Sequence, residues 1–272
     1  MLTLNKMKQQ ILSVLPGDHP WQNTIYCYDT VDSTNNIAKA MAKDGSPEGT
    51  IVIAEAQTAG RGRLGRSFHA PQGLGIYFSL ILRPDCRPEQ LMHLTCAVAV
   101  AMCNAVENCT GFRPQVKWIN DLIANRKKLG GILTELSVNS QTGLVDWAIV
   151  GIGINCKHKA EDFPSELQNI ATSLLQTTGK LITPAELAPY MIIALHEMRK
   201  ELFDKQHAIM DIYRKDCITL GRQVILLRGE ETKPGKALDV DDQGGLIMDY
   251  GDGQPHTVQS GEVSVRDFCG YV

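Results

Sequence analysis

The sequence predicts an α+β fold, in which a meandering sheet with flanking helices is followed by a small β-rich domain. Apolar runs of strand length recur between residues 24 and 154, and segments with helical spacing lie among and after them. Residues 222–272 instead hold short strand-like runs separated by turn-rich pieces. We therefore expect one domain of residues 1–221, a boundary at Gly221, and a small barrel or SH3-like domain of residues 222–272.

The first predicted elements lie on either side of Asp32. Residues 24–28 predict a strand, and Ser33 is a good N-cap for a helix with apolar residues at positions 37, 38, 40 and 41. A ligand can bind at such a helix start, where backbone N–H groups lack helical partners. Further along, strands are predicted at residues 50–56 and 74–82, and a helix with i, i+3, i+4, i+7 spacing at residues 91–106.

The next predicted strands contain paired glycines. Gly130-Gly131 interrupt one strand of a β-hairpin, and Gly151 and Gly153 interrupt the strand that follows. Glycine inside a strand marks a place where a backbone or a ligand comes close. The strands concerned are residues 115–119, 122–124, 129–138 and 145–154, with turns at Asn120-Asp121 and at residues 125–127.

The last helices and strands are introduced by a capping box. Thr183 and Glu186 flank Pro184 at the first helical position, which predicts a long helical region to about Asp216. Beyond Gly221, the predicted strands are residues 223–227, 236–240, 246–250 and 261–266.

Composition excludes several classes of protein. With 43% hydrophobic and 21% charged residues, the 272-residue chain is typical of a globular protein with a full core. Its net charge of -3 argues against a general nucleic-acid or membrane binder. The first residues do not have a signal-peptide pattern, and no apolar run of membrane-span length is expected, so a cytoplasmic location is predicted.

The most informative stretch is the loop of residues 60–66, with three glycines, three arginines and no acid. Glycine lets backbone N–H groups approach a ligand, and arginine offers planar donors that match phosphate and carboxylate oxygens. The loop therefore predicts an anion-binding site, although an isolated basic turn can also be a solvated surface.

Further candidates lie at strand ends, and none is an obvious nucleophile. The histidines and cysteines lack the spacing of a zinc site or a catalytic pair. Cations around glycine suit a reaction in which negative charge on phosphoryl and carboxyl oxygens is stabilised electrostatically. Neither a P-loop nor a dinucleotide-binding fingerprint is found, so a nucleotide would be held in another way. The candidates are Ser33, Thr34, Asn35, Gln57, Lys117, Asn120, Asp121, Lys128 and Asn155.

Five motifs in a fixed order give a specific resemblance. They resemble the motifs of the biotin protein ligases, and residues 261–266 resemble the end of the C-terminal domain of that family. The resemblance covers about residues 24–267 and implies a catalytic sheet like that of class II aminoacyl-tRNA synthetases. The motifs are residues 31–35 (VDSTN), 54–63 (AEAQTAGRGR), 117–121 (KWIND), 128–133 (KLGGIL) and 151–155 (GIGIN).

The resemblance implies a two-step enzyme that joins biotin and MgATP to biotinyl-5′-AMP and then transfers biotin to a lysine of a biotin carboxyl carrier protein. Lys128, Arg61 and Lys117 are the implied catalytic residues. Asp121 would lie near Mg²⁺, through the phosphates. The implied biotin-binding residues are Ser33, Thr34, Asn35, Gln57, Gly60, Arg61, Gly62, Arg63 and Lys128. The implied ATP- or adenylate-binding residues are Arg63, Arg66, Lys117, Asn120, Asp121, Gly131, Gly153 and Asn155.

Two positions depart from the family pattern. Ile119 stands where the family usually has proline, which could loosen the turn that presents Asn120 and Asp121. Leu64 stands where some members have another arginine, so this loop is less basic.

Several alternatives remain open on the residues alone. Ser33 could be only a helix cap, Asn155 a turn former, and Lys117 and Lys128 solvated lysines. Two alternative functions remain. One is a lipoate or octanoate ligase or transferase, and the other is a non-catalytic sensor of biotin or of an adenylate. Because only some twenty residues precede the first predicted strand, we expect a form without a DNA-binding winged helix and without DNA or membrane partners. The sequence does not decide whether a homodimer forms.

Overall fold

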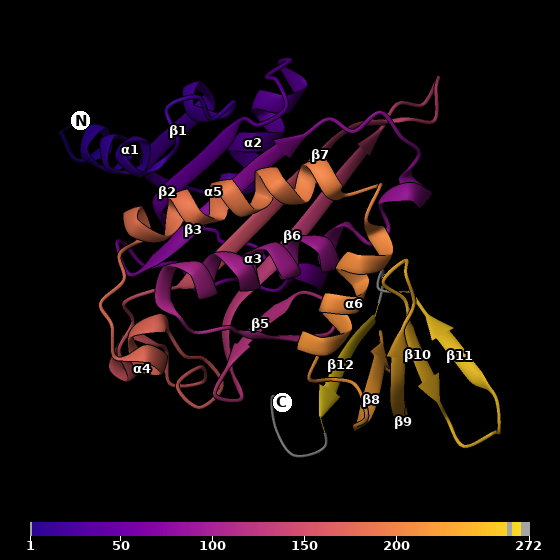
Figure 1. Ribbon diagram of the computed structural model, residues 1–272. Helices are drawn as coiled ribbons and strands as arrows, with labels where there is room; N and C mark the ends of the chain where they lie inside the picture. Colours follow the sequence, from indigo (N-terminus) through magenta and orange to yellow (C-terminus); the bar gives the residue numbers. More distant parts are fainter. Residues whose placement is uncertain (1, 260–262, 268–272) are drawn as a thin grey trace.

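The computed structural model describes residues 2–259 and 263–267 and contains two sheets (Figure 1). The larger sheet has the order β1 (Ile25–Val31), β2 (Ile51–Gln57), β3 (Gly75–Leu82), β7 (Val145–Asn155), β6 (Lys127–Val138), β5 (Asp121–Ala124) and β4 (Gln115–Lys117). β1 pairs with β2 in parallel, and the other neighbours in this sheet are antiparallel. The smaller, antiparallel sheet has the order β11 (Pro255–Val258), β10 (Leu246–Asp249), β9 (Glu231–Val240), β8 (Gln223–Arg228) and β12 (Val263–Asp267).

Helices pack on both faces of the larger sheet. Successive residues of a strand point to opposite faces, so Ile149 of β7 packs with Ala38 of α2 (Thr34–Lys43), whereas Val150 and Ile152 join the core on the other face. That second face is covered by α1 (Leu2–Val14), α3 (Leu94–Thr110) and α5 (Pro184–Glu201), and Figure 1 shows α3 and α5 lying across the strands. The mixed sheet, its helices and the small antiparallel sheet confirm the predicted α+β class.

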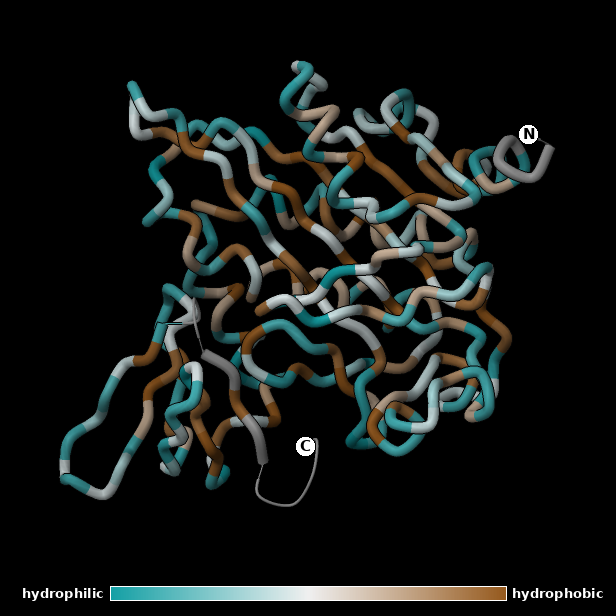
Figure 2. The backbone as a smooth tube through the Cα atoms, turned by 180° about the vertical axis from the view of Figure 1, so that it is seen from behind, coloured by the Kyte–Doolittle hydropathy of each residue, from teal (hydrophilic) through white to brown (hydrophobic). Residues whose placement is uncertain are grey.

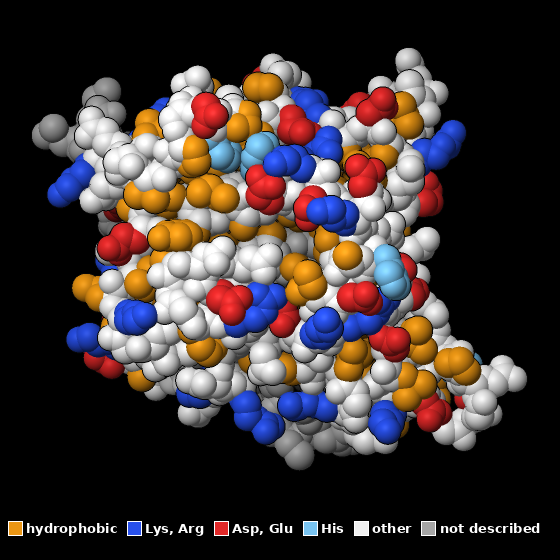
Figure 3. Space-filling view, in the orientation of Figure 1, with side chains coloured by type: hydrophobic (Ala, Val, Ile, Leu, Met, Phe, Trp, Pro, Cys, Tyr) orange, Lys and Arg blue, Asp and Glu red, His pale blue; other side chains and the backbone are white. Residues whose placement is uncertain are grey.

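The backbone hydropathy follows this layering. In Figure 2 the strands of the larger sheet carry most of the brown, hydrophobic segments, and the connecting turns are mainly teal. In Figure 3 the outer surface over α3 and α5 carries charges of both signs, with apolar side chains between them. Among the described helices, Pro88–Thr110 is long and apolar enough to meet the length and composition of a membrane span, contrary to our expectation, and 72% of its most apolar window is buried in the protein.

The smaller sheet shares its core with the larger domain. Val224, Ala237, Val240 and Leu246 belong to the same cluster of buried residues as α3 and α5. Arg214 of α6 (Gln206–Asp216) strengthens this contact, because its Nε donates to the Val240 carbonyl at 2.7 Å and its guanidinium pairs with Asp242. The two parts of the chain are therefore packed against each other.

Some elements differ from the sequence-based predictions. The predicted helical region of residues 183–216 is two helices, α5 and α6, and β11 and the short α4 (Leu174–Thr178) were not anticipated. Helix α1 was also missed, although its buried residues Met7 and Ile11 are four positions apart, as on one face of a helix. Residues 261 and 262 of the predicted last strand lie outside the described residues.

Candidate active site

A cavity of about 520 Å³ lies on the α2 side of the larger sheet, between α2, the loop of residues 60–66, the β4–β5 turn, β6 and β7. Val265 of β12 also lines it, so the smaller sheet contributes one wall. The cavity collects most of the predicted site residues, namely Ser33, Thr34, Asn35, Gln57, Arg61, Gly62, Arg63, Arg66, Lys117, Asn120, Asp121, Lys128, Gly131 and Gly153.

The cavity exists because glycines occupy the two positions of β7 that follow Ile149 on the face toward α2. Gly151 and Gly153 continue the same face of the strand, and the alternation of side chains would otherwise fill this space. A Cβ at Gly151 would overlap the carboxamide of Asn35, and a Cβ at Gly153 would lie 2.6 Å from the ring of Phe68. The sequence predicted the close approach of a backbone or a ligand at these glycines, whereas the side chains of Asn35 and Phe68 lie there.

One end of the cavity is an uncharged polar cluster. Oε1 of Gln57 accepts hydrogen bonds from the Thr34 N–H at 2.8 Å and from the Thr34 hydroxyl at 3.1 Å. Ser79 on β3 lies below them, with its hydroxyl 2.8 Å from Thr34 Oγ1 and 2.6 Å from Asn35 Oδ1. Sequence reasoning missed Ser79, and the signal was a hydroxyl within the otherwise apolar strand IYFSLIL.

Ser33 belongs to this polar end. It precedes α2 with extended backbone angles, yet within the described structure its side chain makes no capping hydrogen bond to the helix. The residue is buried and lines the cavity. Ser33 therefore contributes to the cavity lining, and its side chain does not cap α2.

The loop of residues 60–66 forms a narrow hairpin over the cavity. Arg61 and Ser67 form an isolated β-bridge, and the Gly62 N–H donates to the Arg66 carbonyl at 2.7 Å. The guanidinium of Arg61 donates to Asn36 Oδ1 at 3.1 Å and lies 3.4 Å from Glu135 Oε1. The loop thus has a neighbouring carboxylate, although its own sequence contains no acid.

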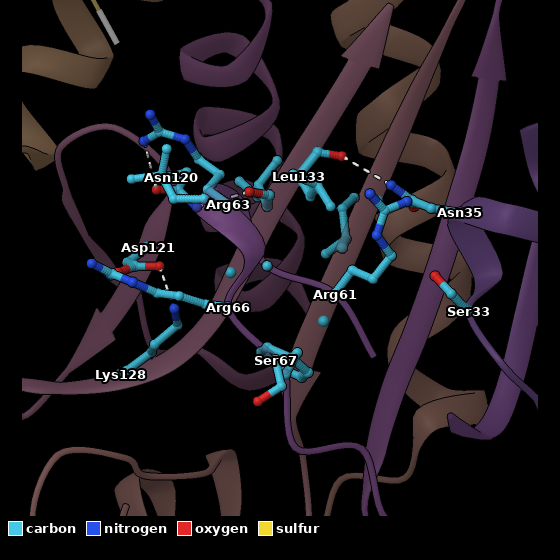
Figure 4. A pocket seen from close by; sticks show the side chains of 18 of the residues that line it. Ser33, Asn35, Arg61, Arg63, Arg66, Ser67, Asn120, Asp121, Lys128 and Leu133 are labelled. Carbon is cyan, nitrogen blue, oxygen red and sulfur yellow. Dashed lines mark hydrogen bonds and ion pairs between the residues drawn. The ribbon is translucent and has the colours of Figure 1, made fainter. Parts of the chain in front are cut away.

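The other end of the cavity is cationic and carries one acid among its described lining residues, Asp121. Lys128 Nζ lies 2.5 Å from Asp121 Oδ1, and Lys117 lies opposite Asp121 in the β4–β5 pair. Arg63 donates to Asn120 Oδ1 at 3.4 Å. Burial lowers the pKa of the Arg63 guanidinium, and the negative charge of Asp121 opposes that shift. Figure 4 shows Lys128, Asp121 and Asn120 on one side of the cavity and Ser33 and Asn35 on the other.

The β4–β5 turn is held in place although Ile119 replaces proline. Asn120 Nδ2 donates to the Ile132 carbonyl, and the Ile132 N–H donates to the Asn120 carbonyl, both at 2.9 Å. Trp118 Nε1 donates to the carbonyl of Gly244, in the turn between β9 and β10 of the smaller sheet, at 3.0 Å. The Trp118–Ile119 peptide is cis.

Two predicted residues do not line the cavity. Asn155 is buried at the end of β7, where its side-chain amide donates to the Thr172 carbonyl at 2.9 Å. Gly60 is the first residue of the loop and packs against the chain at Phe68, where a Cβ would overlap the Phe68 carbonyl oxygen. A contact between Asn155 and adenine therefore stays a prediction. The position of Asn155 outside the cavity lining argues against it.

Comparisons with known proteins identify the family to which the chain belongs. A family model described as the biotin/lipoate A/B protein ligase family matches residues 27–155, and one described as the biotin protein ligase C terminal domain matches residues 219–266. The bifunctional ligase/repressor BirA of Bacillus subtilis is 36% identical over 233 residues, which are 85% of this chain and 71% of that protein. The chain belongs to the biotin protein ligase family. The resemblance inferred from the motifs is thereby confirmed.

Two further relatives extend the match. The biotin--[acetyl-CoA-carboxylase] ligase of Mycobacterium tuberculosis is 32% identical over 240 residues, with 85% of each chain covered. The structure of the biotin protein ligase from Aquifex aeolicus in complex with biotin and ATP superimposes with a TM-score of 0.75 at 30% identity, over 90% of this chain and 99% of that one.

Proposed function

We propose that this protein activates biotin with ATP to biotinyl-5′-AMP and transfers the biotin to a lysine of a biotin carboxyl carrier protein. The observation that carries this proposal is a single cavity with an uncharged polar end at Thr34, Asn35 and Gln57 and a cationic end at Lys117 and Lys128. Such a cavity suits a ligand with a polar, uncharged head and an anionic tail that meets a polyphosphate. The Aquifex relative, which binds biotin and ATP, supports the same pairing.

In the first step, a carboxylate oxygen of biotin attacks the α-phosphorus of ATP, and the bond to pyrophosphate breaks. Both reactants are anionic and repel each other, so fixed cations must offset this repulsion and align the attack. Lys128 and Arg63 are suited to this role because they lie on either side of Asn120 and Asp121. Lys128 has three N–H donors, so its pairing with Asp121 leaves others for substrate oxygens.

In the second step, the amine of the carrier lysine attacks the acyl carbon of the adenylate, and AMP leaves with the bonding electron pair. The amine releases a proton as the amide forms, and because the carrier lysine is itself the nucleophile, the reaction requires none from the enzyme. The loop of residues 60–66 covers the cavity, and we propose that it retains the adenylate and limits its hydrolysis until the carrier arrives.

We propose Mg²⁺ as the metal that accompanies ATP. The described residues contain no group of three or more acidic, histidine or cysteine side chains that could hold a metal alone. Mg²⁺ is commonly held by one or two carboxylates together with substrate phosphates, and the Asp121 carboxylate with the Asn120 side-chain oxygen fits that pattern. The ion would neutralise part of the charge on the phosphates.

The polar end of the cavity favours biotin over lipoate. Biotin has a ureido head with hydrogen-bond donors and an acceptor, whereas the dithiolane head of lipoate would leave Thr34, Asn35 and Gln57 without ligand hydrogen bonds. A buried polar group that loses its partner costs about 1–3 kcal/mol. A lipoate or octanoate ligase or transferase is therefore the second candidate, and a sensor without transfer is the third.

The deciding experiment is ATP–pyrophosphate exchange with purified protein, Mg²⁺ and either biotin or lipoate, followed by single-turnover transfer to a carrier domain. We expect exchange with biotin and labelling of one carrier lysine. Exchange with lipoate alone would assign the second candidate, and tight biotin binding without exchange would assign the sensor.

The remaining expectations concern the setting of the enzyme. We propose that it acts in the cytoplasm and, from its net charge of -3, that it does not bind DNA. Electrophoretic mobility shift at physiological salt tests DNA binding, and sedimentation tests whether a homodimer forms with biotin and ATP.

A further inference from the structure

Glu135 on β6 lies outside the cavity lining but contacts two residues that belong to it, Asn35 and Arg61. Its Oε2 accepts a hydrogen bond from Asn35 Nδ2 at 2.8 Å. Its Oε1 pairs with Lys39 Nζ at 2.5 Å and lies 3.4 Å from Arg61 Nη1. One carboxylate thus joins the polar end of the cavity to the arginine loop.

The carboxylate is ionised and partly shielded from solvent. Its side chain is 21% exposed, compared with 23% for Lys39 and 44% for Arg61. Burial alone would raise the pKa of Glu135, but hydrogen bonds from Lys39 and Asn35 and the charges of Lys39 and Arg61 hold it below the usual value. Ion pairs in such shielded positions are screened less by salt than exposed ones.

The contact with Glu135, together with a longer one from Asn35 Nδ2 to the Leu133 carbonyl at 3.5 Å, decides which way the Asn35 carboxamide points. An ionised carboxylate only accepts hydrogen bonds, so the group that faces it must be Nδ2. Asn35 Oδ1 is therefore left to face the Ser79 hydroxyl, at 2.6 Å, and the cavity side near Gly151. The side chain can offer a ligand an acceptor on that side.

The contact with Arg61 supplies the negative charge that the loop of residues 60–66 lacks. Three guanidinium groups within seven residues repel one another when no anion is near. Arg61 is drawn to Glu135 and to Asn36 at the first turn of α2, which fixes the start of the hairpin. In Figure 4 Arg61 extends from the loop toward Asn35.

We propose that Glu135 is a positioning residue with two separable roles: one oxygen orients Asn35 for the ligand head, and the carboxylate charge holds Arg61 over the cavity before an anionic ligand arrives. The proposal rests on the proposed function, because biotin is the ligand whose head and carboxylate would meet the two residues. When the ligand's carboxylate or phosphate binds Arg61, Lys39 remains as the counter-charge of Glu135.

Two substitutions separate the roles. Glu135→Gln keeps the length of the side chain but removes the charge that holds Arg61, so trypsin should cleave the loop about fivefold faster than in the wild type without ligand. With saturating biotin and MgATP the cleavage rate should return to the wild-type rate, because the adenylate phosphate then supplies the anion. The rate of pyrophosphate exchange at saturating substrates should change by less than about twofold, since Glu135 does not touch the reacting atoms.

Glu135→Asp keeps the charge but shortens the side chain by one methylene, which withdraws the acceptor from Asn35. Its dissociation constant for biotin, measured by calorimetry, should rise about fivefold or more, while its loop should be cleaved more slowly than that of Glu135→Gln. Glu197→Gln is the matched control, because Glu197 pairs with Lys200 on the surface of α5.

Each role is tested alone, so either folded variant is sufficient. A wild-type rate of loop cleavage in ligand-free Glu135→Gln would refute the Arg61 role, and wild-type biotin affinity in Glu135→Asp would refute the Asn35 role. If the wild-type protein neither binds biotin nor exchanges pyrophosphate, the proposed function is wrong, and ligand-free trypsin cleavage still decides whether Glu135 holds the loop.

Discussion

Replacing Gly151 by alanine is expected to disable biotin binding while leaving the fold intact. A Cβ at this position would lie 2.8 Å from both Cγ and Nδ2 of Asn35 and would overlap its Oδ1. Asn35 is 4% exposed and is held by Ser79 and Glu135, so its side chain has little room to move away. The substitution should therefore either displace the carboxamide or shift β7.

The cost can be worked from these contacts. Overpacking a filled site costs about 1–3 kcal/mol. Loss of the bond to Ser79 adds about 1 kcal/mol, and loss of the charge-assisted bond to Glu135 adds about 1.5–3 kcal/mol. These costs are not additive, because a displaced Asn35 side chain loses hydrogen bonds but relieves the overpacking. We therefore expect Gly151→Ala to lower the free energy of unfolding by about 2–4 kcal/mol. Displacement of Asn35 should also raise the dissociation constant for biotin at least about tenfold.

Denaturant unfolding and calorimetry with biotin measure the two effects. Gly17→Ala is the control, since a Cβ there meets nothing within 4 Å. In an Asn35→Ala background the atoms that Gly151→Ala would strike are absent, so the added loss of stability should fall below about 1 kcal/mol. An equal loss in both backgrounds, or wild-type biotin affinity in Gly151→Ala, would refute the steric argument.

Four further outcomes are expected. Lys128→Ala should lower biotin-dependent pyrophosphate exchange about 10²–10³-fold and also slow transfer, and near-normal exchange would remove Lys128 from the mechanism. Arg61→Ala should release the adenylate faster, measured by the half-life of the purified complex. Trp118→Phe loses the donor to the Gly244 carbonyl and should raise KM for ATP more than KM for biotin. Burial, followed by the charge of His69, lowers the pKa of His158 from 6.5 to about 4, so between these pH values the unfolded chain binds more protons than the folded one. The free energy of unfolding should therefore fall by up to roughly 3 kcal/mol as the pH drops from 6.5 to 4. His158→Phe should flatten this pH dependence in denaturant unfolding.

The sequence predicted the parts of the site that are local. Glycines in strands, polar residues before a helix and arginines in a loop are recognisable because each residue type is required by its own backbone position or by the ligand's charge. Most of these residues meet in one cavity because they lie at neighbouring strand ends of one sheet. Asn155 shows the limit, since an asparagine at a strand end can equally bind a backbone carbonyl, here that of Thr172.

The partners contributed by distant strands were beyond sequence reasoning. The loop of residues 60–66 contains no acid of its own, but Glu135 of β6, which also contacts Asn35 and Lys39 of α2, lies beside Arg61. Strand periodicity assigns Glu135 to a face, and only the sheet order and register decide which helix covers that face. The Ser79 hydroxyl stands out within its apolar strand, but nothing local reveals that Thr34 and Asn35 lie above it.

The smaller sheet illustrates that a change in sequence pattern between two parts of a chain does not make them structurally independent. The composition changes after Gly221, yet Val265 lines the cavity and Ala237 and Val240 lie in the common core. Deleting residues 222–272 would therefore expose that core and leave Trp118 without Gly244, so lost activity would not distinguish carrier docking from a damaged site. Trp118→Phe changes one hydrogen bond and keeps the core, and so a selective rise in KM for ATP would locate the influence of the smaller sheet at the β4–β5 turn.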